Sequence, residues 1–285
     1  MQLPLPVKTS WVPKRNNWGD VLAPLLIETL SGQPPVFSRE ANGRCLTVGS
    51  LITPDGLRTG DHIWGSGMLK RADISQTLEL TFHAVRGPIS RELLRDQGWE
   101  VPEVYGDPAL LMPFILKAAP TKHTQRTIGI VPHLTVPTES VAALSHVRAD
   151  IRVIDVTVGV ENFIRELVQC DVVLSSSLHG IIAAEAYGIP AAWVELHQPL
   201  EGLDDVDNHL KYSDCYASTN RECPAPISWM DRFVDAAMVE DAAAQAESTP
   251  RPTLDLESLL RACPFNVRGV WRPEELPGRQ IELIQ

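Results

Sequence analysis

Short apolar runs alternate with helical patterns along most of this chain. Runs rich in β-branched and aromatic residues predict strands at 44–52, 62–68, 81–87, 126–134, 151–156, 171–175 and 191–196. Residues 101–113 predict a further strand that leads into a Gly-Asp-Pro turn. Helical patterns cover residues 20–30, 90–97, 137–146, 161–169 and 179–187. Strands and helices that alternate in this way form βαβ units around parallel sheets.

A polar, proline-containing segment at 117–126 interrupts the alternation and is predicted to be a linker. The two sets of βαβ units therefore predict an α/β protein with two Rossmann-like domains facing a cleft, at 1–118 and 119–226. After Glu201 the pattern weakens, and residues 203–218 are polar. Residues 230–248 predict an amphipathic helix, and 254–265 a short helix capped by Asp255 or Thr253. Residues 227–285 are thus expected to form a helical C-terminal extension that ends in an extended tail.

Composition excludes several classes of protein. The chain has 25 Lys and Arg against 36 Asp and Glu, a net charge of −11, whereas nucleic-acid binding requires a basic face. The five cysteines are widely spaced and contain no Cys-x-x-Cys, which argues against disulfides and zinc and favours a reducing compartment. The chain has neither a signal-like apolar start nor an apolar run of about 18 residues. We therefore expect a cytoplasmic protein.

The polar residues between the strand at 171–175 and the following helix are the first candidate site. They are Ser175, Ser176, Ser177 and His179, followed by Gly180. Ligands bind at the carboxyl ends of parallel strands, and a helix N-terminus attracts anions. Hydroxyl donors and a glycine that allows close approach fit a cradle for phosphate or carboxylate. The alternative is that the serines cap the helix and His179 is an ordinary satisfied polar residue.

A helix dipole contributes roughly 0.3–1 kcal/mol per favourable charge, so a multiply charged ligand also needs cationic side chains. Arg86 lies between a predicted strand and a helix, so its side chain is expected at the same kind of sheet edge. Arg91 is better explained as a solvated helix residue. Lys211 is either a ligand contact or a surface lysine, and His133, after another strand, is either a ligand contact or a turn residue.

Two further loops carry candidate contacts. Asn16, Asn17 and Asp20 precede a helix, where they either cap it or enter the cleft. The glycine-rich strand end Trp64–Met68 lacks the third glycine of a dinucleotide fingerprint, so it is a weak cofactor motif. Asp107 is expected to shape a turn. The chain has no G-x-S-x-G, no G-x-x-x-x-G-K-[ST] and no H-E-x-x-H, and its eight histidines lack metal-ligand spacing, so no metal site is predicted.

Together these stretches resemble the polysaccharide pyruvyl transferase family, most closely its bacterial exopolysaccharide ketal-pyruvate branch. The matching segments are NNWGD (16–20), VGS (48–50), IWGSGM (63–68), VRGPISRELL (85–94), VYGDPALLMP (104–113), GIVPH (129–133), VLSSSLHGIIAAEAYGIP (173–190) and, more loosely, KYSDCY (211–216). They occur in order over roughly residues 10–220. One departure is Ser177-Leu178-His179, where many members have Arg-Leu-His; the exopolysaccharide branch also shows Ser-Leu-His.

The resemblance implies a fold similar to GT-B glycosyltransferases and transfer of the enolpyruvyl unit of phosphoenolpyruvate to a sugar, which forms a pyruvate ketal. Phosphoenolpyruvate would be the donor substrate, with no separate cofactor. Protonated His179 would act as general acid, Arg86 would bind the donor through two parallel hydrogen bonds, and Asp20 or His133 would accept hydroxyl protons. The expected substrate-binding residues are Asn17, Gly65, Ser66, Gly67, Ser175, Ser176, Ser177, Gly180 and Lys211.

Two other functions remain open at this stage. One is a nucleotide-sugar glycosyltransferase on the same architecture, and the other is a non-catalytic sugar-phosphate binding protein. The family branch also implies a lipid-linked acceptor met at the inner face of the membrane. Trp229, Met230 and Phe233, expected on one helix, are the candidate membrane contact, unless that helix simply packs on the body.

Overall fold

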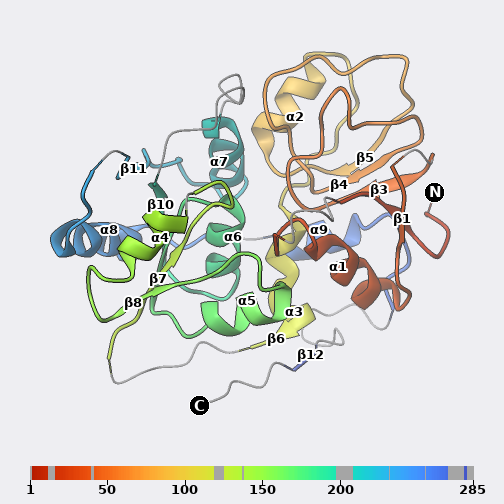
Figure 1. Ribbon diagram of the computed structural model, residues 1–285. Coiled ribbons are helices and arrows are strands. Elements are labelled where there is room, and N and C mark those ends of the chain that lie inside the picture. Colours follow the sequence, from red (N-terminus) through yellow and green to blue (C-terminus); the bar gives the residue numbers. More distant parts are fainter. Residues whose placement is uncertain are drawn as a thin grey trace.

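Two five-stranded parallel sheets form the framework of the molecule (Figure 1). The computed structural model describes residues 2–11, 17–39, 42–118, 125–136, 138–196, 208–230, 232–253, 255–268 and 279–280. We call the described residues up to 118 the N-terminal half and those from 125 to 253 the C-terminal half. Every strand pairing in both sheets is parallel, as the alternating pattern predicted. The α/β class is therefore confirmed.

The N-terminal sheet has the strand order β2-β1-β3-β4-β5. Its strands are β1 (Lys8–Thr9), β2 (Val36–Phe37), β3 (Arg44–Leu46), β4 (His62–Trp64) and β5 (Thr81–Ala84). Two helices belong to it, α1 (Leu22–Ser31) and α2 (Pro88–Arg95). Pro88 at the first helical position suits the start of α2, because that position needs no N–H donor. A 3-10 turn, η2 (Pro108–Leu111), α3 (Met112–Ile115) and β6 (Leu116–Lys117) complete this half.

The C-terminal sheet has the order β11-β10-β9-β7-β8. Its strands are β7 (Ile128–Val131), β8 (Ile151–Val153), β9 (Val172–Ser175), β10 (Ala191–Glu195) and β11 (Ile227–Ser228). The helices are α4 (Thr138–Leu144), α5 (Val160–Leu167), α6 (Leu178–Ala186), α7 (Asn208–Ala217) and α8 (Ala236–Ser248). Strands β7 and β9 are buried at every position, which is typical of central strands covered on both faces.

Of the three hydrophobic clusters among the described residues, the largest spans the two halves. A single cluster of buried residues contains Trp18, Trp64 and Leu110 from the N-terminal half and Phe163 and Ile181 from the C-terminal half. The turn η2 packs directly on α6. This shared core holds the loops of the two halves against each other, so residues far apart in the sequence can form one site.

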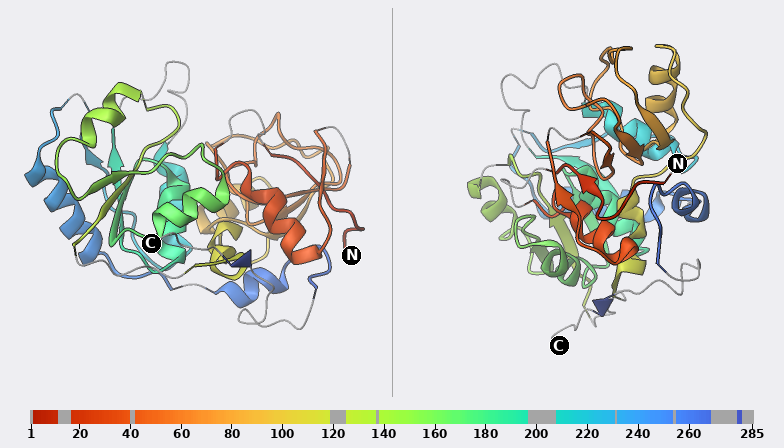
Figure 2. Two further views of the ribbon diagram at one scale, coloured as in Figure 1. Left: turned by 60° about the horizontal axis from the view of Figure 1, so that its bottom comes forward. Right: turned by 90° about the vertical axis from the view of Figure 1, so that its right-hand side faces the viewer.

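The chain after residue 226 packs on both halves rather than forming one extension (Figure 2). Strand β11 joins the C-terminal sheet and α8 packs on β9 and β10, whereas α9 (Leu256–Arg261) lies beside the N-terminal half (Figure 1). There the indole of Trp64 donates a hydrogen bond to the carbonyl of Leu259, at 2.7 Å. Strand β12 (Arg279–Gln280) pairs with β6. The domain limits at 118 and 226 remain predictions.

Several predicted elements differ from the structure. Residues 101–113 form no strand beyond a single bridge at Tyr105; they enter η2 and α3 instead. The polar segment 203–218 contains α7, which was not predicted. The predicted helix at 230–248 begins only at Ala236, where the Asp235 side chain caps it by accepting the N–H of Met238 at 2.9 Å. The cap predicted at Asp255 is confirmed. Most of the predicted linker, 119–124, lies outside the described residues.

The late helix start corrects the expected position of the three candidate membrane residues. Trp229 directly follows β11 and is 2% exposed, and Met230 is half-buried. Phe233 is 91% exposed on the loop before α8. None of the three lies on a helix. Within the described part of the chain, no helix has both the length and the apolarity that crossing a membrane requires.

Candidate functional site

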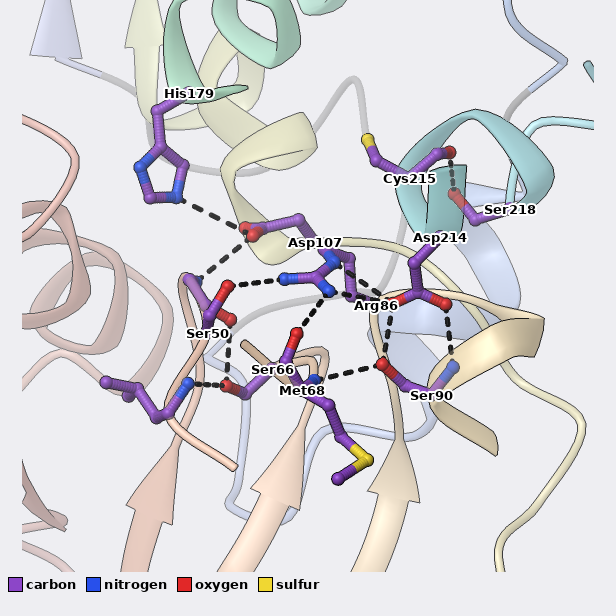
Figure 3. Close-up of polar contacts among 12 residues, drawn as sticks. Ser50, Ser66, Met68, Arg86, Ser90, Asp107, His179, Asp214, Cys215 and Ser218 are labelled. Carbon is purple, nitrogen blue, oxygen red and sulfur yellow. Dashed lines mark hydrogen bonds and ion pairs between the residues drawn. The ribbon is translucent and has the colours of Figure 1, made fainter. Parts of the chain in front are cut away.

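A loop after β3 brings residues of both halves together (Figure 3). In this 48–51 loop, the Ser50 hydroxyl accepts a hydrogen bond from Nη1 of Arg86 at 2.6 Å, and the Gly49 N–H donates to Oδ2 of Asp107 at 3.1 Å. Nε2 of His179 lies 3.7 Å from the same carboxylate oxygen. Arg86 and His179, the two residues that the sequence singled out most strongly, therefore lie on either side of one loop.

His179 lies in the first turn of α6, and glycines surround its ring. A Cβ atom at Gly19 would lie 2.4 Å from Nδ1, and one at Gly49 would lie 3.5 Å from Cε1. Trp18 meets the ring edge-on, with 5.9 Å between ring centroids, and itself stacks on Phe163 at 4.2 Å. Nε2 is buried and makes no hydrogen bond in the described part of the chain. The imidazole is thus held in place while one ring nitrogen keeps an unused hydrogen-bonding capacity.

Asp107 shapes a turn, as predicted, and also has a second contact that sequence reasoning missed. Its Oδ1 accepts the Ala109 N–H at 2.9 Å and so caps η2, and its side chain is fully buried. Its Oδ2 faces Gly49 and His179. An aspartate in a Gly-Asp-Pro turn is explained by the turn alone, so no local signal pointed to His179.

Arg86 is completely buried in a network of protein oxygens. Nε and Nη2 lie 3.1 and 3.0 Å from Oδ2 of Asp214, and Nη2 donates to the carbonyl of Met68 at 2.8 Å. Asp214 also accepts the N–H and the hydroxyl of Ser90, at 2.8 and 2.6 Å. Each guanidinium nitrogen therefore already has a protein partner. The expected two-bond contact with a ligand would have to replace some of these partners.

Lys211 lies on α7, one turn before Asp214. Among the described residues its amine makes no hydrogen bond or salt bridge, and Nζ lies 5.4 Å from the centroid of the Tyr212 ring. Burial, together with the positive charge of Arg86, lowers the pKa of Lys211 to about 8. Arg86 and Lys211 carry two positive charges against the one negative charge of Asp214. The cluster therefore has an excess cation that suits an anionic ligand.

The three serines at the end of β9 have different roles in the fold. Ser175 is fully buried; its hydroxyl donates to backbone carbonyls of Val131 and Ser177, at 3.0 and 2.8 Å. Ser176 accepts the N–H of His133 at 2.8 Å. Ser177 occupies the N-cap position of α6, but its side chain makes no capping hydrogen bond. Ser176 and Ser177 therefore border the start of α6, whereas the Ser175 hydroxyl is used inside the fold.

Several other candidate residues support loops. The Ser66 hydroxyl donates to the Gly49 carbonyl and accepts the Leu51 N–H, both at 2.9 Å. A Cβ at Gly67 would lie 2.4 Å from Cζ of Arg86, and one at Gly180 would lie 2.3 Å from Oγ of Ser175. These glycines leave space for the neighbouring side chains. Their expected contacts with substrate remain predictions.

The loop before α1 is also built from candidate residues. Oδ1 of Asn17 accepts the Gly19 N–H at 3.2 Å, which shapes the turn that brings Gly19 against His179. Asp20 is half-buried at the end of this turn. The N-cap residue of α1 is Val21, which makes no side-chain capping hydrogen bond, so neither Asn17 nor Asp20 occupies the N-cap position. Gly65 has φ +83°, and Pro108 packs beside it, which links this strand end to the Asp107 turn. Asn16 lies outside the described residues.

Buried polar atoms without partners cluster near this region. Five such side-chain atoms occur in the described part of the chain, and Trp18 Nε1, Thr47 Oγ1 and His179 Nε2 belong to the three segments that meet at His179. Buried polar groups normally have a hydrogen-bond partner, and exceptions mark functional positions or bound molecules.

A cavity of about 1120 Å³ lies elsewhere, between α4 and the loop before α8, and no candidate residue of the site lines it.

Comparisons with known proteins bear on the same segments. The chain is 26% identical over 163 residues to "Uncharacterized protein L143" of Acanthamoeba polyphaga mimivirus, a match that covers 56% of this chain and 55% of that protein. The chain thus spans about half the length of the curated relative it matches. No solved structure matches. The model of the family described as polysaccharide pyruvyl transferase matches residues 60–198.

The matched range includes Arg86, Asp107, His133 and the segment from Ser175 to His179, whereas Asn17 and Lys211 lie outside it. The match confirms the resemblance that the motifs indicated: residues 60–198 carry the sequence pattern of the polysaccharide pyruvyl transferase family.

Proposed function

We propose that this protein transfers the enolpyruvyl unit of phosphoenolpyruvate to a pair of hydroxyls on a sugar of an exopolysaccharide precursor, forming a pyruvate ketal. One observation supports this proposal most. His179, whose imidazole is held at the start of α6, and the excess cation of the Arg86–Lys211–Asp214 cluster lie on the two sides of the 48–51 loop. The arrangement combines a proton carrier with positive charge, the two properties that a trianionic enol phosphate requires.

Phosphoenolpyruvate carries about three negative charges at neutral pH, on a phosphate and a carboxylate close together. Lys211 would contact one of these groups directly, because its amine has no other anion to neutralise among the described residues. The start of α6 would add backbone N–H donors, and Ser176 and Ser177 would add hydroxyls. Arg86 would contribute its charge and would hold Ser50, rather than release its protein partners.

The chemistry needs one proton delivered and two removed. Protonated His179 would donate from Nδ1, the ring nitrogen that does not face Asp107, to the methylene carbon of the donor, and C2 would then accept attack by one sugar hydroxyl. Phosphate leaves as the C2–O bond to it breaks, and the second hydroxyl closes the ketal on C2. One of the two hydroxyl protons returns to His179 and the other leaves with phosphate. Asp20 and His133 are the proposed acceptors that relay these protons.

The two parallel sheets fit a GT-B-like arrangement, which we propose with the acceptor bound between the halves. A lipid-linked acceptor would be met at the inner face of the membrane. Phe233, which is 91% exposed, and the neighbouring exposed Arg232 provide an apolar and a cationic group for contact with an anionic lipid surface.

The test is an assay with phosphoenolpyruvate and a panel of glycolipid acceptors, in which phosphate release and product mass are followed together. The product should gain the mass of pyruvate less one water. His179→Gln should lower the rate by about 100-fold or more. The control is His146→Gln, the same substitution at an exposed histidine in the turn that follows α4; it should leave the rate unchanged. A wild-type rate in His179→Gln would remove that residue from the mechanism.

Ligand-induced shifts in melting temperature, together with phosphate release, distinguish the proposed function from the two alternatives. If nucleotide sugars but not phosphoenolpyruvate raise the melting temperature, the protein is a glycosyltransferase and the proposal is wrong. If phosphoenolpyruvate binds but no phosphate is released with any acceptor, a binding protein is the better description.

A further inference from the structure

We infer that Asp107 is a positioning residue for His179: its buried carboxylate holds the imidazole so that Nε2 carries a proton and faces Asp107. The catalytic consequence rests on the proposed function, because it requires His179 to act in the transfer. The structural part of the inference does not rest on the proposed function, because it concerns only which ring nitrogen carries the proton.

The two oxygens of Asp107 have different neighbours. Oδ1 accepts the Ala109 N–H at 2.9 Å and serves the turn. Oδ2 accepts the Gly49 N–H at 3.1 Å and lies 3.7 Å from Nε2 of His179. The carboxylate is fully buried, and in the described part of the chain His179 is its one ionisable neighbour at ion-pair distance. A buried carboxylate requires hydrogen-bond donors, and an N–H on Nε2 is the donor available on this side.

The surroundings of the ring favour one orientation. Cε1 faces Gly49 and Nδ1 lies against Gly19, so Nε2 is the ring atom that meets the carboxylate. A half-turn of the ring would exchange Nε2 with Cε1 and place a carbon beside Oδ2. The nitrogen of an imidazole that carries the proton is set by the hydrogen bond that the ring makes. Asp107 therefore selects both the rotation of the ring and the tautomer of its neutral form.

The distance of 3.7 Å is longer than a hydrogen bond. Hydrogen bonds of this kind are often long in a protein without substrate and shorten when substrate binds. A shift of less than one ångström in η2 or in the 48–51 loop would bring the two atoms into hydrogen-bond range. The 48–51 loop bonds Arg86 through Ser50 and bonds Asp107 through Gly49. An anion that binds near Arg86 would therefore act on the same loop that carries the contact with Asp107.

The primary test uses Asp107→Asn, with Asp235→Asn as a matched control. Both aspartates cap the start of a helical turn, and asparagine caps about as well as aspartate. Nitrogen-15 spectra of protein labelled on histidine report the tautomer directly, and His179→Gln identifies the signal of His179. We expect the Nε2–H tautomer of His179 in wild type, a changed tautomer population in Asp107→Asn, and the wild-type spectrum in Asp235→Asn. An unchanged His179 signal in Asp107→Asn would overturn the inference.

Kinetics with phosphoenolpyruvate provide the second readout. Loss of the group that orients a metal-ligating histidine typically costs about 10- to 100-fold. By analogy, kcat of Asp107→Asn should fall by about that factor while KM for the donor stays within about threefold. A fall in affinity with unchanged kcat would show a structural role instead. Should Asp107→Asn fail to fold, Asp107→Ser keeps a capping oxygen and removes the carboxylate, and the same spectra apply.

The two proposals fail in distinguishable ways. If His179→Gln retains wild-type turnover, the proposed mechanism is wrong, and the spectra still decide whether Asp107 sets the tautomer. If His179→Gln is inactive but Asp107→Asn has wild-type kcat and an unchanged spectrum, the proposed function stands and the role of Asp107 is refuted.

Discussion

At the scale of single residues, the charge of Lys211 is the feature that links stability to function. A lysine whose pKa is lowered to about 8 by burial carries its charge at neutral pH at a cost to the folded state. The shift from the ordinary value of 10.5 to about 8 corresponds to about 3 kcal/mol at most. A bound phosphate or carboxylate would offset this cost, because no anionic side chain among the described residues pairs with Lys211.

Lys211→Met should therefore stabilise the unliganded protein and weaken its binding of the donor. At pH 7 lysine is charged in both states, and we expect the free energy of unfolding to rise by roughly 1–3 kcal/mol. Between pH 8 and about 10.5 the folded lysine is neutral while the unfolded one is still protonated, so wild type gains stability and the difference shrinks. Urea unfolding at pH 7 and pH 9.5 measures both values. Lys70→Met, at an exposed position, should change neither stability nor the KM for phosphoenolpyruvate. Equal stability of Lys211→Met and wild type at pH 7 would show that the amine is well solvated.

The contact between Ser176 and His133 is the part of the site that the sequence predicts, because of the positions of these residues in the strands. Ser176 and His133 each follow a buried central strand, and the carboxyl ends of adjacent parallel strands meet at one edge; their hydrogen bond follows from that geometry. The contacts of Asp107 and Asp214 with the site were not predicted, because the local sequence around each aspartate already accounts for it as a turn residue or a surface residue. Their partners lie in distant segments that only the shared core brings close.

At the scale of secondary-structure elements, α7 connects the two halves. Tyr212 stacks on Trp193 of β10 with 3.8 Å between ring centroids, and its hydroxyl donates to the Ser176 carbonyl at 3.1 Å. On the same helix Asp214 binds Arg86 and Ser90 of the N-terminal half. The helix was not predicted because its buried residues include Asp214, which obscures the apolar period of a helix. The central strands were predicted well, whereas two-residue strands such as β1 and β11 are too short to show any period.

The Arg86–Asp214 pair should make a large contribution to holding α7 in place. Asp214→Ala leaves a buried guanidinium without its carboxylate, which should lower the free energy of unfolding by about 3–5 kcal/mol. Asp150→Ala breaks the pair with Arg148 at the surface and should cost at most about 1 kcal/mol. Denaturant unfolding of both variants gives the comparison.

The double variant Arg86→Met with Asp214→Leu supplies the control for charge. It removes both buried charges, so it should recover much of the stability lost in Asp214→Ala but none of the turnover. A cost for Asp214→Ala as small as that of Asp150→Ala would mean that water reaches Arg86 and that α7 does not depend on the pair.

At the scale of the whole molecule, a segment near the C-terminus packs against the N-terminal half. After α8 has covered the C-terminal sheet, the segment 255–268 packs on the N-terminal half, where the Leu3 N–H donates to the Pro264 carbonyl at 2.6 Å and the Arg268 N–H donates to the Leu30 carbonyl at 2.8 Å. Phe265 is 1% exposed and meets Trp64 with 5.8 Å between ring centroids. Because this contact belongs to the cluster that also contains Phe163 and Ile181, the two halves should not unfold independently.

Phe265→Ala tests this coupling, with Phe233→Ala as a control of identical chemistry. Removing a buried phenyl ring should lower the free energy of unfolding by about 3–5 kcal/mol, whereas Phe233 is 91% exposed and its removal should cost no more than about 0.5 kcal/mol. Since the core is shared, hydrogen exchange in β4 and in β9 should speed up together in Phe265→Ala, and near- and far-ultraviolet circular dichroism should report one transition. Faster exchange confined to β4, or two separate transitions, would show that the halves are independent folding units, and the site between them would then depend on docking of preformed domains.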